Sequence, residues 1–181
     1  MKDLGAPPAT MVANTTAAMA SMDFRSFMAG FPTGVGIVTT TDPAGGRPWG
    51  MTCSSLCSVS VDPPTLLVCL RRGSPTLDAV LRRLAFAVNL LHERGRRAAE
   101  LFASGDPDRF GRVRWSTPSG CGGPHLVDDA HAVADCRVLR HDTIGDHTVV
   151  FGEVYQVQQQ PVPHSLPLLY GRRQYASWPL R

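Results

Sequence analysis

Lysine is almost absent from this chain of 181 residues. Of its 18 basic residues only Lys2 is a lysine, and the arginines include scattered pairs such as Arg71-Arg72 and Arg82-Arg83. Proteins that bind nucleic acid concentrate their basic residues on one face, usually with aromatic residues between them. Here the basic residues are dispersed and the net charge is only +3, so we expect no nucleic-acid partner.

Long apolar runs are absent as well. No segment reaches the roughly 20 consecutive apolar residues of a transmembrane helix, so no contact with a membrane is expected. The N-terminal segment is rich in Ala, Thr and Pro and lacks the basic start and apolar centre of a signal peptide. We therefore expect residues 1–21 to form a disordered tail and residues 22–181 to form one domain.

The cysteines do not follow the patterns of a disulfide framework or a metal site. There are five of them, and no C-x-x-C motif is present. Cys53 and Cys69 lie in runs of small or apolar residues, which is typical of reduced thiols in a cytoplasmic protein. The spacing of Cys121 and His125 is too common on its own to predict zinc, and we expect no metal.

Three well-known catalytic or nucleotide-binding motifs are also missing. There is no G-x-S-x-G element, which argues against a Ser-His-Asp hydrolase. Gly34-Val-Gly36 has no third glycine and continues as a strand, so it does not match the G-x-G-x-x-G of a Rossmann unit. No P-loop is present either.

What the sequence does contain is a series of short strands with a few helices between them. Helices are expected at Phe24–Ala29, after Ser74-Pro75, and at about Arg94–Ala103. In the second of these, Ser74 is the expected N-cap, and the apolar stripe consists of Leu77, Val80, Leu81 and Leu84. The expected strands are 35–41, 49–60, 66–70, 86–91, 132–141 and 148–157. The run 66–70 is apolar throughout, as in a strand buried on both faces.

The order of these elements indicates the fold class. Strands and helices do not alternate regularly, which argues against a doubly wound parallel sheet. The last two long strands are joined by a turn at Ile144-Gly-Asp146 and form a hairpin. A mainly β (α+β) fold fits better, built as a closed or split antiparallel barrel with peripheral helices.

Two polar segments stand out against this framework. The first runs from Thr52 to Ser60, between predicted strands in the middle of the fold. Taken alone it is either a strand with one face in water or a group of hydroxyls and N–H groups that need a ligand. The second is Gly145-Asp-His147, which places an imidazole on a turn.

Two further sites remain open on the residues alone. Arg71, Ser74 and Thr76 lie at the end of a strand and the start of a helix, where free N–H groups suit a phosphate, although Ser74 is equally well explained as a cap. Asn89 interrupts an apolar strand and either contacts a ligand or makes a structural hydrogen bond.

Together, the segments Phe31-Pro-Thr-Gly34, Gly50–Pro64 and Gly145-Asp-His147 resemble the short-chain flavin reductases, the NAD(P)H:flavin oxidoreductase components of two-component flavin-dependent monooxygenases. The resemblance spans about Met22 to Trp178. It implies a Greek-key split β-barrel of the flavin-reductase/FMN-binding type, paired as a homodimer. The residues that it assigns to the flavin are Thr33, Gly34, Thr52, Cys53, Ser54, Ser55 and Ser60.

The resemblance also assigns the remaining site residues. It places Arg71, Ser74 and Thr76 near the flavin phosphate, and His147 beside the flavin face where the nicotinamide stacks, as the one catalytic residue. Tyr170, Arg172 and Tyr175 match a C-terminal segment near the same cleft. Asn89 is added to this cofactor-binding set as a candidate.

The implied activity is hydride transfer from NAD(P)H to a flavin that then leaves for a partner monooxygenase. The family favours FAD, with FMN as the alternative. No basic cluster for a 2′-phosphate is evident along the chain, which favours NADH over NADPH. A non-catalytic flavin-binding barrel, an oxidase of the pyridoxamine-phosphate type and a scaffold subunit are the competing hypotheses. We expect the protein to act in the cytoplasm.

Overall fold

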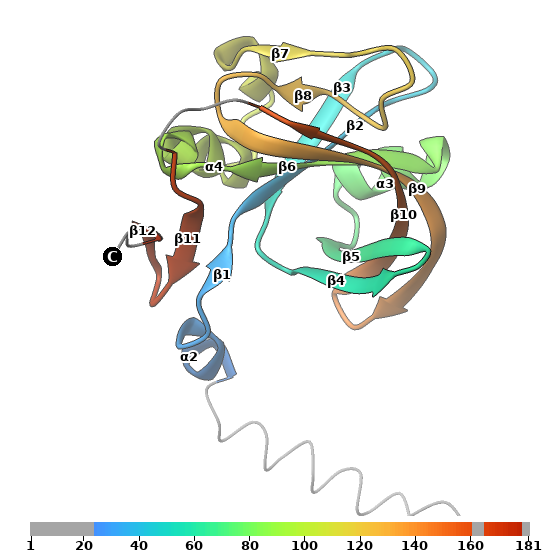
Figure 1. The fold of residues 1–181 in the computed structure, drawn as a ribbon. Coiled ribbons are helices and arrows are strands. Elements are labelled where there is room, and N and C mark those ends of the chain that lie inside the picture. The colour runs from blue at the N-terminus through green and yellow to red at the C-terminus, as the bar shows by residue number, and fades with distance from the viewer. Residues whose placement is uncertain (1–23, 161–164, 179–181) are drawn as a thin grey trace, which may run out of the picture.

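The computed structural model describes residues 24–160 and 165–178 (Figure 1). The predicted tail, residues 1–21, lies outside the described residues. The strands are β1 (Thr33–Gly34), β2 (Gly36–Thr41), β3 (Pro48–Cys53), β4 (Leu56–Val61), β5 (Pro64–Arg71), β6 (Ala85–Leu91), β7 (Trp115–Ser116), β8 (His125–Leu126), β9 (Ala130–Ile144), β10 (His147–Gln159), β11 (Leu168–Gly171) and β12 (Gln174–Ser177). The helices are α2 (Phe24–Ala29), α3 (Pro75–Arg83) and α4 (Arg96–Ala103), with 3-10 turns η1 (Glu93–Gly95) and η2 (Arg109–Arg112). None of the helices in these two ranges combines the length and apolar composition that crossing a bilayer requires.

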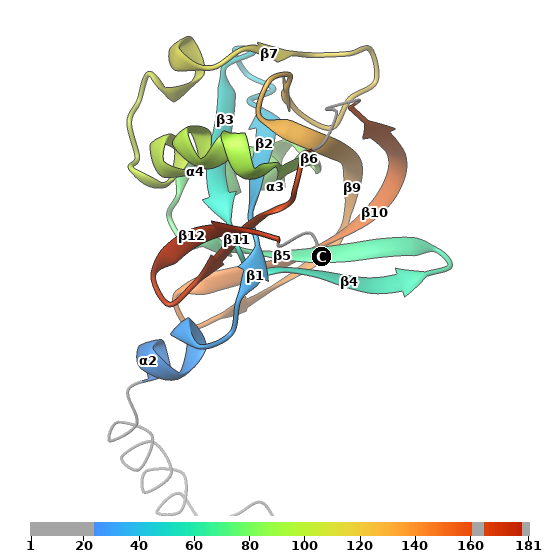
Figure 2. The same ribbon diagram turned by 60° about the vertical axis from the view of Figure 1, so that its left-hand side comes forward.

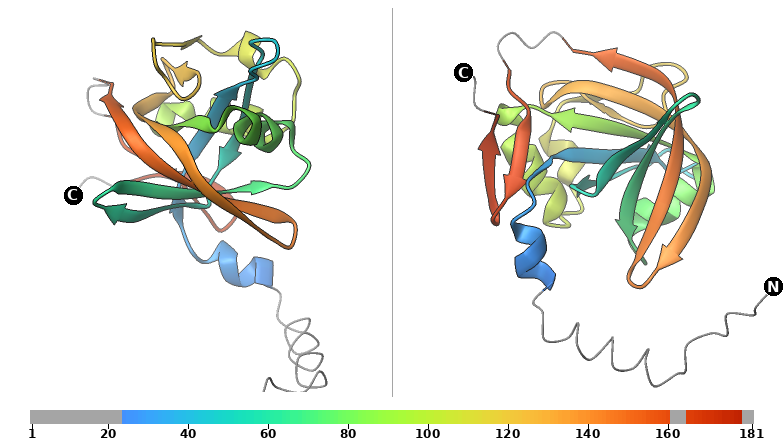
Figure 3. Two further views of the ribbon diagram at one scale, coloured as in Figure 1. Left: turned by 90° about the vertical axis from the view of Figure 1, so that its right-hand side faces the viewer. Right: turned by 60° about the horizontal axis from the view of Figure 1, so that its bottom comes forward.

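One antiparallel sheet of seven strands forms most of the molecule. Its strand order is β3-β2-β6-β9-β10-β5-β4. Strands β6, β9 and β10 follow one another as a meander, while the earlier β5 lies beside β10, which is a Greek-key arrangement. The sheet curves round on itself, but its edge strands β3 and β4 do not pair (Figure 1, Figure 3). The prediction of a mainly β fold with a split barrel and peripheral helices is therefore confirmed.

A smaller sheet of three strands, in the order β1-β11-β12, stands beside the barrel (Figure 2). Val35 joins the two sheets. Its N–H donates to the carbonyl of Leu168, and its own carbonyl accepts from the N–H of Leu91, both at 3.0 Å. Because β1 leads through Val35 straight into β2, the small sheet is held at a fixed place next to the large one.

Two helices close the core on different sides. α3 contributes Leu77 and Val80 to a cluster with Phe86, and α4 contributes Phe102 to a second cluster. The predicted cap of α3 is confirmed, since the Ser74 hydroxyl accepts a hydrogen bond from the N–H of Leu77 at 3.2 Å. Leu84, however, does not belong to the buried stripe. It is the C-cap, with left-handed φ of 56°, and its side chain is exposed.

The segment predicted as one strand from Trp49 to Ser60 is two strands. β3 and β4 are separated by Ser54 and Ser55 and lie at opposite edges of the large sheet. The prediction that residues 66–70 are buried on both faces is also wrong. Val68 and Leu70 are fully buried, but the alternate residues of β5 are only half-buried, because that face looks into a cavity.

Candidate functional site

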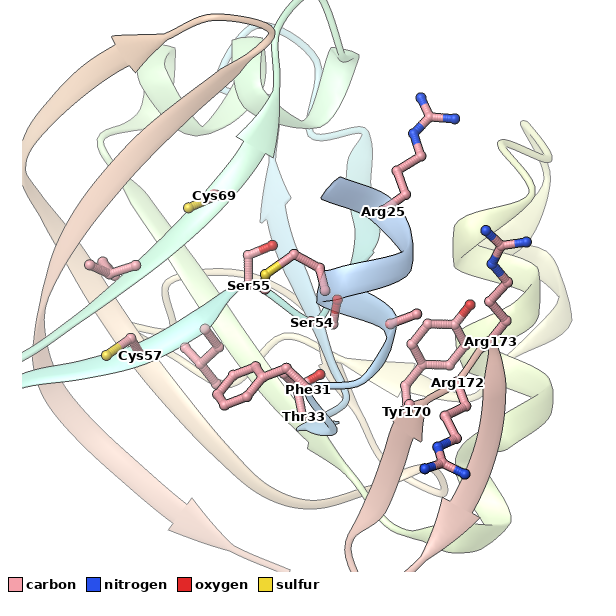
Figure 4. Close-up of a pocket in the computed structure, with 15 residues that line it drawn as sticks. Arg25, Phe31, Thr33, Ser54, Ser55, Cys57, Cys69, Tyr170, Arg172 and Arg173 are labelled. Atoms are coloured by element: carbon pink, nitrogen blue, oxygen red, sulfur yellow. The ribbon is translucent and has the colours of Figure 1, made fainter. Parts of the chain in front are cut away.

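A cavity of about 560 Å³ lies between α2, β1 and β11 on one side and the β4–β5 hairpin on the other (Figure 4). Small-molecule sites usually have volumes of about 300–1,000 Å³. Five residues of the predicted cofactor set line the cavity, and these are Thr33, Ser54, Ser55, Tyr170 and Arg172. The other lining residues are Arg25, Met28, Ala29, Phe31, Leu56, Cys57, Leu67, Cys69, Gly171 and Arg173.

The polar part of the cavity lies at the junction between strands β3 and β4. β3 ends at Cys53 and β4 begins at Leu56, so Ser54 and Ser55 belong to neither strand. In the described part of the chain, the side-chain hydroxyls of Ser54, Ser55 and Thr33 have no hydrogen-bond partner. Three unpaired hydroxyls facing one cavity form a natural set of partners for a polar ligand edge.

The opposite wall is less polar and comes from β5. Successive residues of a strand point to opposite faces, so Leu67 and Cys69 face the cavity while Val68 and Leu70 face the core. Burial raises the pKa of the Cys69 thiol above its ordinary value. At neutral pH this thiol is therefore protonated and serves as a small, soft surface rather than as a nucleophile.

His147 lies on the same face of the sheet as this wall. In the antiparallel ladder of β5 and β10, Cys69 pairs with Val149 and Arg71 pairs with His147. Directly paired residues point to the same side, and two residues along a strand span about 7 Å. The imidazole is therefore placed on a continuation of the cavity wall, about two residues beyond Cys69, with Arg71 as its cross-strand neighbour.

The turn that carries His147 is anchored to the end of β5. The Arg72 guanidinium donates to the carbonyl of Gly145 at 3.2 Å, and the Arg72 N–H donates to the carbonyl of Asp146 at 3.0 Å. The Asp146 carboxylate lies 2.9 Å from His147 Nδ1. This hydrogen bond is the main cause of the lowered pKa of Asp146. The imidazole therefore has a fixed partner on one ring nitrogen, which leaves Nε2 free for a ligand.

Ser74 and Thr76 lie just after β5, at the start of α3. The Ser74 oxygen is occupied by the N–H of Leu77, and the Thr76 side chain is buried. The structural role of Ser74 is thus certain, and a role in phosphate binding would depend on the free N–H groups of the helix.

Three other residues of the predicted set have partners inside the protein, and the structure does not bring them to the cavity. The Thr52 hydroxyl donates to the carbonyl of Ala99 at 2.6 Å and so ties β3 to α4. Cys53 is buried, and this burial raises its pKa to about 11. The Asn89 amide is completely buried and uses both ends, since its oxygen accepts from the N–H of Leu126 and its nitrogen donates to the carbonyls of Ile37 and Pro124 and to Thr39 Oγ1.

Gly34 and Ser60 also lie outside the cavity lining. Gly34 is exposed in β1, and a Cβ added there would meet nothing within 4 Å, so the position does not need glycine for space. The Ser60 hydroxyl donates to the carbonyl of Asp62 at 3.0 Å, near the tip of the β4–β5 hairpin.

The two C-terminal tyrosines form a tilted aromatic pair, of which only Tyr170 lines the cavity. Tyr170 lines the cavity, and its ring centroid is 5.0 Å from that of Tyr175. The Arg96 guanidinium lies 5.5 Å from the Tyr175 ring, and burial raises the pKa of Tyr175. Tyr175 thus supports Tyr170 from behind.

Sequence reasoning missed the residues that enter the cavity only through the fold. Arg25 comes from α2 and Arg173 from the β11–β12 turn, and no local pattern indicates that these segments meet. Leu67 and Cys69 could have been found, because strict alternation along β5 puts them on the same face as Arg71.

The cavity fits a flavin ring system by its chemistry. Apolar atoms of Met28, Leu56 and Leu67 suit an aromatic face, and the free hydroxyls suit the carbonyls and N–H of a pyrimidine edge. Arginines at one end suit phosphate. The fold and the site therefore define a split-barrel protein with a nucleotide-sized ligand cavity.

Comparison with known proteins agrees with this class. Residues 28–179 match the family model described as flavin reductase like domain. The chain is 55% identical, over 86% of its length and 89% of the relative's, to the flavin reductase (NADPH) of Lentzea aerocolonigenes. The chain belongs to the flavin reductase-like family.

Two of the solved structures that are similar to this one come from a monooxygenase component and an oxidoreductase. Component B of a nitrilotriacetate monooxygenase from Mycobacterium thermoresistibile has a TM-score of 0.81 and 34% identity, covering 90% of this chain and 89% of that one. An NADH:FAD oxidoreductase of Streptomyces globisporus, solved with NAD and FAD fragments, has a TM-score of 0.78 and 31% identity, covering 86% and 91%.

Proposed function

We propose that this protein is an NAD(P)H:flavin oxidoreductase that supplies reduced flavin to a monooxygenase. The observation that carries the proposal is one face of the large sheet. Leu67 and Cys69 on this face line the cavity opposite the free hydroxyls of Ser54 and Ser55, and the same face continues beyond the lining residues to His147. The names of the relatives support the same reaction and its cofactors, with FAD or FMN as the flavin and NADH or NADPH as the reductant.

The protein's own contribution is binding and orientation. When bound, the cofactors supply the redox chemistry, in which a hydride passes from nicotinamide C4 to flavin N5. Thr33, Ser54 and Ser55 would hold the polar edge of the flavin, and Leu67 and Cys69 would exclude water from its face. His147 would orient the nicotinamide through Nε2, with Nδ1 held by Asp146. Among the described residues that line the cavity there is no carboxylate to act as an acid or base, and hydride transfer needs none.

The test is oxidation of NADH and of NADPH by the purified protein, with FAD, FMN or no flavin added. We expect oxidation that depends on added flavin. Flavin binding without turnover would favour the competing hypothesis of a non-catalytic flavin-binding barrel, and neither binding nor turnover would contradict both hypotheses.

A monooxygenase component is the proposed acceptor of the reduced flavin. Component B of the nitrilotriacetate monooxygenase, which this structure resembles over 90% of the chain, supports this partner class. Transfer of reduced flavin to an added monooxygenase would be detected by the formation of that monooxygenase's product.

We further propose a homodimer built from the domain at residues 22–181. None of the residues of α2 is buried, and its Phe24 and Phe27 side chains are 57% and 66% exposed. Val61 in the β4–β5 hairpin is 92% exposed. Apolar surface of this kind usually meets a partner. The proposed location is the cytoplasm, which is supported by five unbridged cysteines.

A further inference from the structure

Three arginines at the cavity have no partner for their charge. Most arginine side chains in residues 24–160 and 165–178 have a hydrogen bond, an ion pair or an aromatic contact, as Arg82 has with Asp42. The arginines of these ranges whose side chains have none are Arg25, Arg71, Arg97, Arg172 and Arg173, although the charge of Arg71 acts on the nearby Asp146. Arg25, Arg172 and Arg173 line the cavity, and Arg71 and Arg97 do not. We name Arg25, Arg172 and Arg173 the arginine rim.

The arginine rim occupies one end of the cavity. Figure 4 shows Arg25, Arg172 and Arg173 on one side, Cys57 and Cys69 on the other, and Ser54 and Ser55 between them. A ligand whose ring lies along the serines would therefore extend its remaining groups toward the arginines.

The backbone of two rim residues is held in an unfavourable conformation. Arg172 and Arg173 are the two central residues of the β11–β12 turn and have φ of 50° and 62°. Such turns favour Asn and Gly because both positions need positive φ. Long side chains in this region of φ are rare, and backbone strain of this kind is found preferentially at ligand sites.

A hydrogen bond holds the two parts of the rim together. The N–H of Arg172 donates to the carbonyl of Ala29 at 2.6 Å. Ala29 follows Arg25 by four residues in α2, which puts the two on one face of the helix. Three cations from two distant segments are thus brought to one place, and none of the acidic residues that the structure describes pairs with them. Because like charges repel, binding of an anion between these arginines would be strongly favoured.

We infer that the arginine rim binds a phosphate group of an adenine dinucleotide. The inference rests on the proposed function, since a flavin reductase takes dinucleotides into this cavity. A guanidinium offers a fork of N–H donors that matches two phosphate oxygens. Of the phosphate groups that such dinucleotides carry, the proposal names two, the 2′-phosphate of NADPH and the diphosphate of FAD. The sequence favoured NADH because no basic cluster is visible along the chain, whereas the fold assembles one.

Direct binding measurements on the full chain test the inference without relying on turnover. Calorimetry compares 2′,5′-ADP with 5′-AMP, which differ by the 2′-phosphate, and fluorescence quenching compares FAD with FMN. The variants are Arg25→Ala, Arg173→Ala and the double variant. Arg97→Ala is the matched control, since it removes an equally unpaired arginine away from the cavity.

In the rim variants, we expect the affinity of the protein to fall selectively for one ligand of a pair, either 2′,5′-ADP or FAD. Loss of a charge-assisted hydrogen bond should weaken binding about tenfold per arginine, while the control keeps wild-type values. A selective loss for 2′,5′-ADP identifies the 2′-phosphate of NADPH, and a selective loss for FAD identifies the flavin diphosphate. Arg173→Lys should recover part of the affinity, because it restores the charge but not the fork.

Unchanged ratios in both pairs, with normal thermal unfolding of the variants, would overturn the inference. A wild-type protein that oxidises neither NADH nor NADPH with any flavin would count against the proposed function instead. The two ligand ratios can still be measured in that case, so the two failures are distinguishable.

Discussion

His147 is oriented by its neighbours in the β9–β10 turn and in β5. Asp146 holds Nδ1 at 2.9 Å, and the ladder with Arg71 fixes the backbone. Asp146 is highly exposed, so this hydrogen bond serves orientation more than stability. A group that orients one ligand should affect that ligand alone.

His147→Ala should raise the KM for the nicotinamide cofactor or slow flavin reduction, by about tenfold for the loss of one well-placed hydrogen bond. The dissociation constant of the flavin should change little. Steady-state kinetics and flavin titration measure the two quantities. Leu84→Gly, far from this turn, is the control. A collapse of flavin binding in the His147 variant would show that the imidazole contacts the flavin instead.

Cys69 should report occupancy of the cavity. Because burial raises the pKa of this thiol above its ordinary value, the thiol is protonated at pH 7, and alkylation by iodoacetamide should be slow there and accelerate at alkaline pH. Added FAD should slow the reaction at every pH. Mass spectrometry measures the modification, with the buried Cys53 as an unreactive internal control. Equal rates with and without FAD would place the flavin elsewhere.

Single residues also show how far sequence alone could predict the site. Ser54, Ser55 and Thr33 belong to local motifs, and they do line the cavity. Asn89 was ambiguous because a buried amide satisfied by the protein and one satisfied by a ligand give the same sequence signal. Arg25 and Arg173 carry no local signal at all, because their proximity depends on a hydrogen bond between α2 and the β11–β12 turn.

The β11–β12 turn is the element in which stability and binding oppose each other. Its two arginines hold left-handed backbone that Asn and Gly adopt more readily. The same side chains make up most of the arginine rim.

Arg172→Asn combined with Arg173→Gly should therefore raise the free energy of unfolding by about 1 kcal/mol and weaken phosphate binding. Chemical denaturation measures the first effect, and calorimetry with 2′,5′-ADP together with fluorescence quenching by FAD measures the second. Leu84→Gly is the matched control, because Leu84 also has positive φ and an exposed side chain but lies at the end of α3. It should gain stability without loss of binding. A destabilised double variant would mean that the turn is not strained.

Elements were predictable where the signal was local. The Ser74 cap, the Pro75 start of α3 and the β9–β10 hairpin follow from short-range chemistry, and all are confirmed. The chain from Trp49 to Ser60 was mistaken for one strand because its composition does not change where it crosses between the two edges of the sheet. The sequence of an apolar run such as 66–70 does not show whether its side chains are buried in a core or face a cavity.

The whole molecule presents an apolar surface at the end that carries α2. Phe24 and Phe27 project from a helix with no buried residue. Such a helix gains little stability from contacts within its own domain, and we propose that it packs against a second copy of the chain.

Phe27→Asp should shift the protein from dimer to monomer, because a charge in an apolar interface is costly to desolvate. Light scattering coupled to size-exclusion chromatography measures the mass. Leu84→Asn, which alters an exposed apolar residue on α3, should leave the mass unchanged. A wild-type monomer at micromolar concentration would contradict the proposed dimer directly.

The cavity walls come from both sheets, with Thr33 and Tyr170 in the small one and Leu67 and Cys69 in the large one. A ligand seated between them acts as a removable crosslink, since it binds only when the two sheets are docked. By mass action, its binding energy adds to the free energy that holds β11 and β12 in place. Amide hydrogen exchange in these two strands should then slow in proportion to flavin concentration, while exchange in the central strand β6 stays constant. The stability of the small sheet therefore depends on the concentration of flavin that is available for binding.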